Sequence, residues 1–162
     1  MKQQPYNRLA AVAYAKRWAM ARNPAFYDFS ELGGDCTNFV SQCVYAGSLV
    51  MNFTPTFGWY YRSLQDRTPS WTGVDYFYNF MVNNEGPGPQ MTETGPKDMR
   101  PGDVIQLGHA NDDYYHTLLV TRTGLFPGVN NIAVATHTFD AYMRPLNTYE
   151  AEKMRFLHVN DA

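Results

Sequence analysis

The sequence predicts an α+β domain in which N-terminal helices pack against a C-terminal antiparallel sheet. In the first half of the chain, apolar residues recur at intervals of three or four, which is the spacing of one helix face. Beyond residue 100, short runs of β-branched and aromatic residues are separated by turn formers, a pattern typical of strands. At 162 residues, the chain has the length of one domain, residues 1–162, with its own core.

The first expected helix covers residues 5–22. Its apolar face is formed by side chains three or four positions apart: Tyr6, Ala10, Tyr14, Trp18 and Ala21. Pro5 suits the first turn, where a backbone N–H has no partner within the helix. The Asn23-Pro24 pair should end the helix, because a residue that precedes proline disfavours helical geometry.

A second helix should begin at Cys36, directly after a Gly33-Gly34-Asp35 turn. Its apolar face is formed by Phe39, Val40, Cys43 and Val44. Gly47 is placed to stop this helix, since glycine readily adopts the left-handed conformation that follows many last turns. Cys36 is therefore expected at the N-terminus of a buried helix.

The middle of the chain predicts a surface excursion, one more helix and a linker. Residues 51–71 are aromatic but rich in turn formers, which favours a path over the surface. Ser70 is suited to cap a helix that ends near Asn83-Asn84. The buried face of that helix would consist of Val74, Phe77, Tyr78 and Met81. Residues 85–98 contain several prolines and glycines and are expected to form a linker.

Four runs in the second half predict consecutive antiparallel strands. They follow a turn at residues 100–103 and cover residues 104–107, 114–124, 130–138 and 154–159. Helices followed by such strands define the α+β class.

Composition excludes several functions. The net charge of −2 gives no basic footprint for nucleic acid. No apolar run approaches the roughly 18 residues of a membrane span, and the first thirty residues do not resemble a secretory signal. On one helix, the Cα atoms of Cys36 and Cys43 would lie about 10.5 Å apart, beyond the reach of a disulfide or of one shared zinc ion.

Cys36 is the residue best placed for chemistry. A thiol attacks as the thiolate, and its pKa falls from about 8.5 at a helix N-terminus or beside an imidazolium. The start of a helix would also aim the Cys36 N–H at a developing oxyanion. The alternative is a buried and inert thiol, as most free cysteines are, and Cys43 fits that alternative well.

A base for Cys36 should be one of the four histidines. His116 begins one predicted strand and His137 ends the next, so a turn centred near residues 126–127 would bring the two imidazoles side by side. One would then act as base and the other would orient it. The alternatives are a half-exposed strand residue for His116 and a hydrogen-bonded rim residue for His137. His109 and His158 are typical of loop and surface positions.

The run GGDCTNFVSQCVYAG at residues 33–47 resembles the nucleophile segment of the papain-like NlpC/P60 and CHAP amidohydrolases. The closer similarity is to the putative amidase domain family of Gram-positive bacteria, and it covers nearly the whole chain. The segments that carry it are YNRLAAVAYAKRW, NPAFYDF, GGDCTNFVSQ, WYY, SWTGV, RPGDVIQL, HTLLV and ATHTFD.

This resemblance implies a papain-like (NlpC/P60-type) fold and a cysteine amidase or peptidase that hydrolyses amide bonds, with peptides of cell-wall peptidoglycan as substrates. Cys36 matches the nucleophile and His116 the base. His137 matches the polar third residue, with Asp140 as second choice, and Tyr27 is the nearest match to an oxyanion tyrosine. The resemblance implies no metal or organic cofactor, and it favours a secreted or wall-associated protein.

Two further residues are candidates for substrate contact. Asp35 could contact substrate, although a role as helix cap is at least as well supported. Trp59 could line an aromatic groove together with Tyr60, Tyr61 and Trp71, although such side chains usually belong to a core. Such a groove would also suit a non-catalytic module that binds wall peptides, which is the alternative function.

Overall fold

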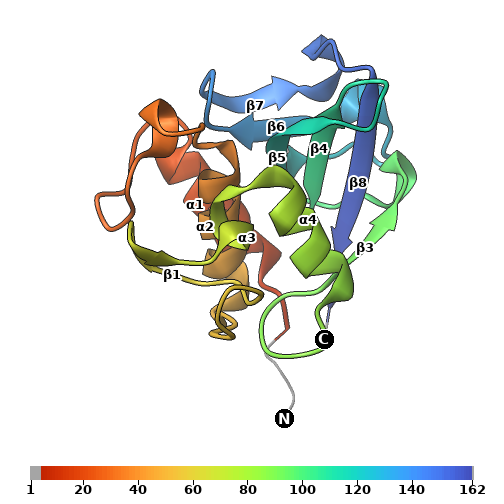
Figure 1. The fold of residues 1–162 in the computed structure, drawn as a ribbon. Helices are drawn as coiled ribbons and strands as arrows, with labels where there is room; N and C mark the ends of the chain where they lie inside the picture. Colours follow the sequence, from red (N-terminus) through yellow and green to blue (C-terminus); the bar gives the residue numbers. More distant parts are fainter. Residues whose placement is uncertain (1–4, 162) are drawn as a thin grey trace.

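The computed structural model describes residues 5–161 and shows an α+β fold with helices on one side and an antiparallel sheet on the other (Figure 1). The helices are α1 (Arg8–Trp18), α2 (Cys36–Ser48), α3 (Pro69–Thr72) and α4 (Val74–Asn83). Short 3-10 turns lie at η1 (Phe29–Glu31), η2 (Pro96–Asp98), η3 (Val129–Asn131) and η4 (Leu146–Thr148). Within residues 5–161, no helix is long and apolar enough to cross a membrane.

Helix α1 is shorter than expected at both ends. Pro5 precedes the helix, and Asn7 caps it by accepting a hydrogen bond from the Ala10 N–H at 3.0 Å. The helix ends at Trp18, several residues before Asn23-Pro24, so proline is not what stops it.

Helix α2 begins at Cys36, as predicted, but Gly47 does not end it. The helix continues to Ser48 and stops at Leu49, which has a positive φ of 58°. At Gly47 a Cβ atom would lie 2.5 Å from a ring carbon of Tyr6, so the glycine lets the segment before α1 pack against α2.

The expectation of a surface excursion over residues 51–71 holds for residues 53–57, which are exposed, but is wrong for Trp59 and Trp71. This segment contains a short hairpin, β1 (Tyr61–Ser63) and β2 (Asp66–Arg67), and places two tryptophans in the core. Trp59 and Trp71 are both 0% exposed and their ring centroids lie 4.6 Å apart. Burial of this much aromatic surface outweighs the local preference of the turn formers for water.

The third predicted helix is divided into α3 and α4. Thr68, not Ser70, precedes α3, because the Ser70 hydroxyl lies inside the helix and donates to the Gly58 carbonyl at 2.6 Å. Gly73 is extended, with φ −107° and ψ 134°, and it separates the two helices.

A six-stranded antiparallel sheet has the strand order β3-β8-β4-β5-β6-β7. The four predicted strands are β4 (Val104–Gly108), β5 (Tyr114–Arg122), β6 (Ala133–Thr136) and β8 (Lys153–Val159). Two strands were not predicted: β3 (Met91–Thr94), inside the expected linker, and β7 (Ala141–Pro145). The strands are not consecutive throughout, because β8 lies between β3 and β4.

Side chains on the two faces of the sheet belong to two separate hydrophobic clusters. Leu119 and Ala135 pack with the residues of α1, α2 and α4. Leu118, Val120 and Val134 pack on the other face, where Leu146 and Phe156 complete the smaller cluster. Alternation along β5 therefore decides which of its residues face the cysteine helix.

Candidate active site

A glycine turn places Cys36 at the start of α2. Gly33 and Gly34 have positive φ values of 86° and 101°, which side chains with a Cβ adopt only with strain. The Gly34 N–H donates to the Phe29 carbonyl at 3.0 Å, which closes the turn against η1. Asp35 then precedes the first helical residue, Cys36.

The N-terminus of α2 is bonded to strand β5. The hydroxyl oxygens of Thr37 and Thr117 lie 2.8 Å apart, and both residues are buried. The backbone N–H of Thr117 lies close enough to the Cys36 sulfur to lower the pKa of the thiol. Cys36 therefore lies against β5 beside the residue that follows His116.

Burial controls the protonation of Cys36. The side chain is 7% exposed, and removal from water raises the pKa of the thiol. Hydrogen bonds from the backbone N–H groups of Thr117 and Thr37 and from the Thr37 hydroxyl lower the pKa, but they do not compensate. The expectation of a lowered pKa is therefore wrong, because desolvation outweighs the helix terminus.

His116 is held as a neutral imidazole. Its Nε2 lies 3.3 Å from the Thr136 hydroxyl, and that hydroxyl donates to backbone carbonyls at 2.8 Å (His137) and 3.0 Å (Thr117). The Thr136 oxygen is then the acceptor and Nε2 carries the proton, which leaves Nδ1 unprotonated. Burial, together with the positive charge of Arg144, lowers the pKa of His116 from 6.5 to about 4.

His116 and His137 do not lie side by side. The β5–β6 register pairs Leu119 with Ala135 and Val120 with Val134. Continued by two residues, this register places position 117, not 116, opposite His137, so the two imidazoles point to opposite faces of the sheet. The predicted turn position was correct to within one residue. A shift of one residue in the pairing of β5 with β6 is nevertheless enough to move a side chain to the other face of the sheet.

His137 forms a buried ion pair with Asp35. Its Nδ1 lies 2.5 Å from Asp35 Oδ2, and its Nε2 lies 2.8 Å from the Trp18 carbonyl oxygen. The Trp18 carbonyl can only accept, so Nε2 donates to it, and Nδ1 is engaged by Asp35. The ring also stacks on Phe39 at 4.2 Å. This arrangement leaves His137 no nitrogen with which to orient His116.

The Asp35 carboxylate joins three elements. Oδ1 accepts from the Phe29 N–H at 2.8 Å and from the Asn38 amide at 2.9 Å. Arg22 approaches Oδ2 at 3.7 Å. Asp35 makes no side-chain cap bond to the α2 backbone and is 1% exposed, so it is engaged within the protein and does not face a substrate.

The remaining predicted residues are distributed as follows. Asp140 forms a bidentate pair with Arg22, at 2.9 and 3.0 Å, and makes no bond to His116. Trp59 is buried and donates to the Ser41 hydroxyl at 3.2 Å, out of a substrate's reach. Tyr27 is 43% exposed, and its carbonyl accepts from the Asn38 amide at 2.9 Å, which places Tyr27 beside the first turn of α2.

A cavity of about 320 Å³ opens beside His116. Its lining includes Tyr115, Thr138, Arg144 and Glu150. The Thr138 hydroxyl accepts from the Asp35 N–H at 3.2 Å, so the cavity adjoins the turn before Cys36. Among residues 5–161, no hydrogen bond joins the Cys36 sulfur to an imidazole.

Sequence reasoning missed Thr136. The residues of β6 are all small or β-branched, so residue type does not single out Thr136. What identifies it as a partner of His116 is that both side chains lie on the same face of the sheet. A correct register between β5 and β6 would have found it. In the described part of the chain, no group of three or more His, Cys, Asp or Glu side chains is placed to hold a metal ion.

Comparison with known proteins identifies the family. The model of the putative amidase domain matches residues 5–160, and the chain belongs to this family, which points to a hydrolase acting on amide bonds. The chain is 33% identical over 144 residues to the uncharacterized protein YhbB of Bacillus subtilis, covering 86% of this chain and 43% of that protein. It is 26% identical over 124 residues to the uncharacterized protein YjcM of the same organism, covering 72% of this chain and 28% of the relative.

The chain thus spans less than half the length of these curated relatives. No solved structure matches it.

Proposed function

We propose that this chain is a cysteine-dependent amidase with a papain-like arrangement, and that it hydrolyses amide bonds through an acyl-enzyme. One observation supports this proposal most strongly. His116 lies on β5, the strand to which the N-terminus of the cysteine helix is bonded through Thr37 and Thr117. Its neutral imidazole is held by Thr136 of β6, and its unprotonated Nδ1 is left to act as base.

The first half of the reaction needs a proton transfer, because the resting Cys36 is a thiol. As the sulfur attacks the carbonyl carbon, the S–H proton passes to His116 Nδ1 and the carbonyl electron pair moves to oxygen. Collapse of the tetrahedral intermediate breaks the C–N bond, and the imidazolium returns its proton to the departing amine. Water, deprotonated by His116, then hydrolyses the thioester and restores the thiol.

The start of α2 offers the oxyanion site. Within residues 5–161, no hydrogen bond uses the Cys36 backbone N–H, which lies at the positive end of the helix dipole. Tyr27 lies beside the same turn, and its phenol makes no hydrogen bond in the described structure. We assign the oxyanion contact to the Cys36 N–H, with Tyr27 as its partner.

The third role belongs, in this proposal, to Thr136 and not to His137 or Asp140. Thr136 fixes the tautomer of His116, which is the task of the orienting residue in a nucleophile and base pair. The ion pair of Asp35 and His137 holds the turn before Cys36 against β6 and so positions the nucleophile.

The substrate proposed is the peptide part of peptidoglycan, by analogy with the family. The lining of the cavity at His116 supports a substrate peptide with charged groups, because it includes one basic residue, Arg144, and one acidic residue, Glu150. Peptidoglycan peptides contain both free carboxylates and free amines.

Hydrolysis of purified peptidoglycan is the direct test. We expect new amino groups to appear with multiple turnovers per protein, measured by amine labelling and mass spectrometry of the released peptides. Because the base must be neutral and the pKa of His116 is about 4, kcat/KM should be retained down to about pH 5 and lost as the pH falls through 4. His116→Ala should abolish turnover, whereas His109→Ala, at an exposed loop position, should not.

Thr136→Val should lower kcat about 10- to 100-fold with little change in KM, because His116 would lose the acceptor that fixes its tautomer. Thr136→Ser should restore most of the rate, since it keeps the hydroxyl. The measurement is steady-state kinetics on folded protein, with thermal unfolding of both variants as a control for stability. An equal loss of rate in the Val and Ser variants would contradict the role of Thr136.

The burial of Cys36 favours a second candidate function, a module that binds wall peptides without cleaving them. A thiol of raised pKa with no hydrogen bond to an imidazole is also what an inert core cysteine would show. The same hydrolysis assay separates the two functions. Binding to peptidoglycan without any released amine would favour the binding module.

A further inference from the structure

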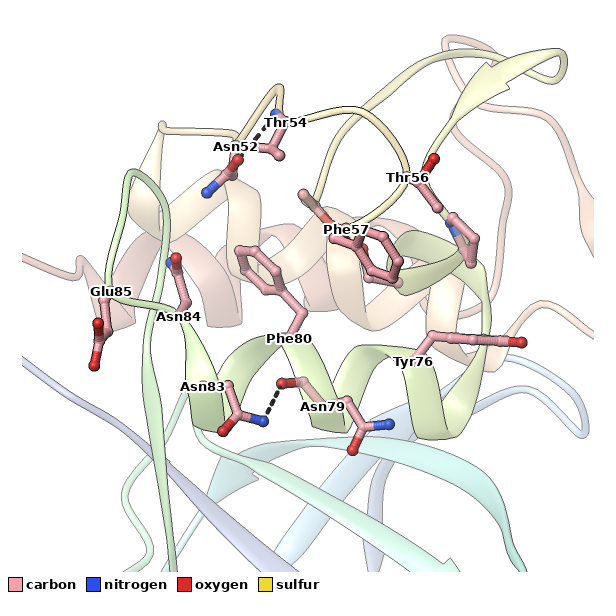
Figure 2. A pocket seen from close by; sticks show the side chains of 13 residues that line it. Asn52, Thr54, Thr56, Phe57, Tyr76, Asn79, Phe80, Asn83, Asn84 and Glu85 are labelled. Atoms are coloured by element: carbon pink, nitrogen blue, oxygen red, sulfur yellow. Dashed lines mark hydrogen bonds between the residues drawn. The ribbon is translucent and has the colours of Figure 1, made fainter.

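A second cavity, of about 450 Å³, lies between α4 and the loop of residues 52–58. Its volume is within the range of about 300–1,000 Å³ that is typical of small-molecule sites. It shares no lining residue with the cavity at His116. Figure 2 shows Tyr76, Asn79, Phe80 and Asn83 along one side of α4, with Phe57 on the loop above them.

Two aromatic residues that line this cavity are exposed to solvent. Phe57 is 84% exposed and Tyr76 is 63% exposed. In the described part of the chain, neither ring packs against another aromatic ring, whereas Phe80 stacks on Trp59 and is anchored in the core. Exposed ring faces that line a cavity with polar neighbours mark a binding site more often than scattered surface residues do.

Apart from Glu85, the polar groups around these rings are neutral. The Asn79 side chain makes no hydrogen bond within residues 5–161, and Asn83 donates to the Asn79 carbonyl at 2.8 Å, which leaves the Asn83 Oδ1 available. Thr54 and Thr56 add hydroxyl groups. The lining contains no lysine or arginine, and Glu85 is its one acidic residue, so an anionic ligand would find no counter-charge.

The loop that carries Phe57 is held in one shape. The Asn52 amide donates to the Pro87 carbonyl at 3.0 Å and its Oδ1 accepts from the Thr54 N–H at 3.0 Å. A Cβ at Gly58 would lie 2.3 Å from the Asn52 carbonyl oxygen, so only glycine fits there. Thr56 has a positive φ of 65°, a strained conformation for a β-branched residue and one that recurs at functional sites.

We propose that this cavity binds a neutral oligosaccharide. The face of a sugar ring is formed by C–H groups and would stack on Phe57 and Tyr76, while its hydroxyls would bond the amides of Asn79 and Asn83. An amide both donates and accepts, as a hydroxyl does, so the two groups satisfy each other in any orientation. A purely apolar ligand would leave these amides unpaired, and an anion would meet only Glu85.

The test is a titration of the full chain with chitotriose, maltotriose and cellotriose, followed by NMR shifts of the ¹⁵N-labelled backbone. We expect at least one of these sugars to shift residues 52–58 and 76–83, with saturation by about 10 mM if the Kd is near 1 mM. Phe57→Ala should weaken binding roughly fivefold to tenfold through the loss of one stacked ring. Phe126→Ala is the matched control, because Phe126 is 85% exposed and lies outside both cavities.

Three results would overturn the proposal. The first is the absence of shifts with all three sugars. The second is equal binding by the wild type and the Phe57 variant. The third is displacement of the sugar by trialanine, because a short peptide would then be the occupant. Asn79→Leu, which removes the amide but keeps a side chain of similar size, should also weaken sugar binding, and unchanged affinity in this variant would contradict the assigned contacts. None of these outcomes depends on Cys36, so this site stands or falls apart from the proposed amidase activity.

Discussion

Cys36→Ala should abolish the hydrolysis of peptidoglycan peptides, with a loss in kcat of at least about 10³-fold. The reason is that the proposed thioester intermediate forms on the Cys36 sulfur and cannot form without it. The measurement is the rate of amine release under saturating substrate. Mass spectrometry of the wild-type protein, quenched during turnover, should in addition show an adduct on the peptide that contains residue 36.

Cys43→Ala is the matched control for that variant. Cys43 lies two turns further along α2, is fully buried and takes no part in the proposed chemistry. It should cost about 1 kcal/mol of stability and leave kcat within a factor of two. Hydrolysis that survives in the Cys36 variant would refute a cysteine mechanism, whatever the Cys43 variant does.

Asp35→Ala should lower the free energy of unfolding by about 3–5 kcal/mol, the largest loss we expect from one side chain. The carboxylate is 1% exposed and holds Asn38, His137 and the Phe29 backbone. Its removal leaves the buried His137 Nδ1, the Asn38 amide and the Phe29 N–H without their partner. Denaturation in urea, followed by tryptophan fluorescence, measures this loss.

Asp28→Ala is the comparison variant, because Asp28 is an exposed carboxylate that, like Asp35, contacts Arg22. Asp28 contacts Arg22 Nε at 3.3 Å, but its side chain is 45% exposed, and such a pair contributes about 1 kcal/mol or less. If both variants lost the same small amount, the ion pair of Asp35 and His137 would not be the buried anchor described above.

Sequence patterns predicted α2 and four of the six sheet strands, because α2 has apolar residues at helical spacing and the strands are rich in β-branched and aromatic residues. The burial of Trp59 and Trp71 was not predictable in the same way. It depends on Ser41 and Asn38 of α2, which accept hydrogen bonds from the indole N–H groups of Trp59 and Trp71. Donor and acceptor lie more than 15 residues apart in the sequence. Strand β3 was missed because its few residues gain their pairing from β8, at the far end of the chain.

The candidate site was predicted only in part. The position of Cys36 followed from local signals, namely two glycines and an apolar face. The partner of His116 did not, because it depends on the register between two strands, and an error of one position exchanged Thr136 for His137. The raised pKa of Cys36 was also beyond local signals, since burial is a property of the whole fold.

The place of β8 in the sheet has a consequence for how the protein acquires its structure. β8 pairs with both β3 and β4, so residues 91–94 and 104–108 lack their shared neighbour until residues 153–159 have left the ribosome. Completion of the sheet must therefore wait for the end of synthesis of this segment. Until then β4 presents an open strand edge and β3 has no strand partner, and unpaired strand edges of this kind promote aggregation.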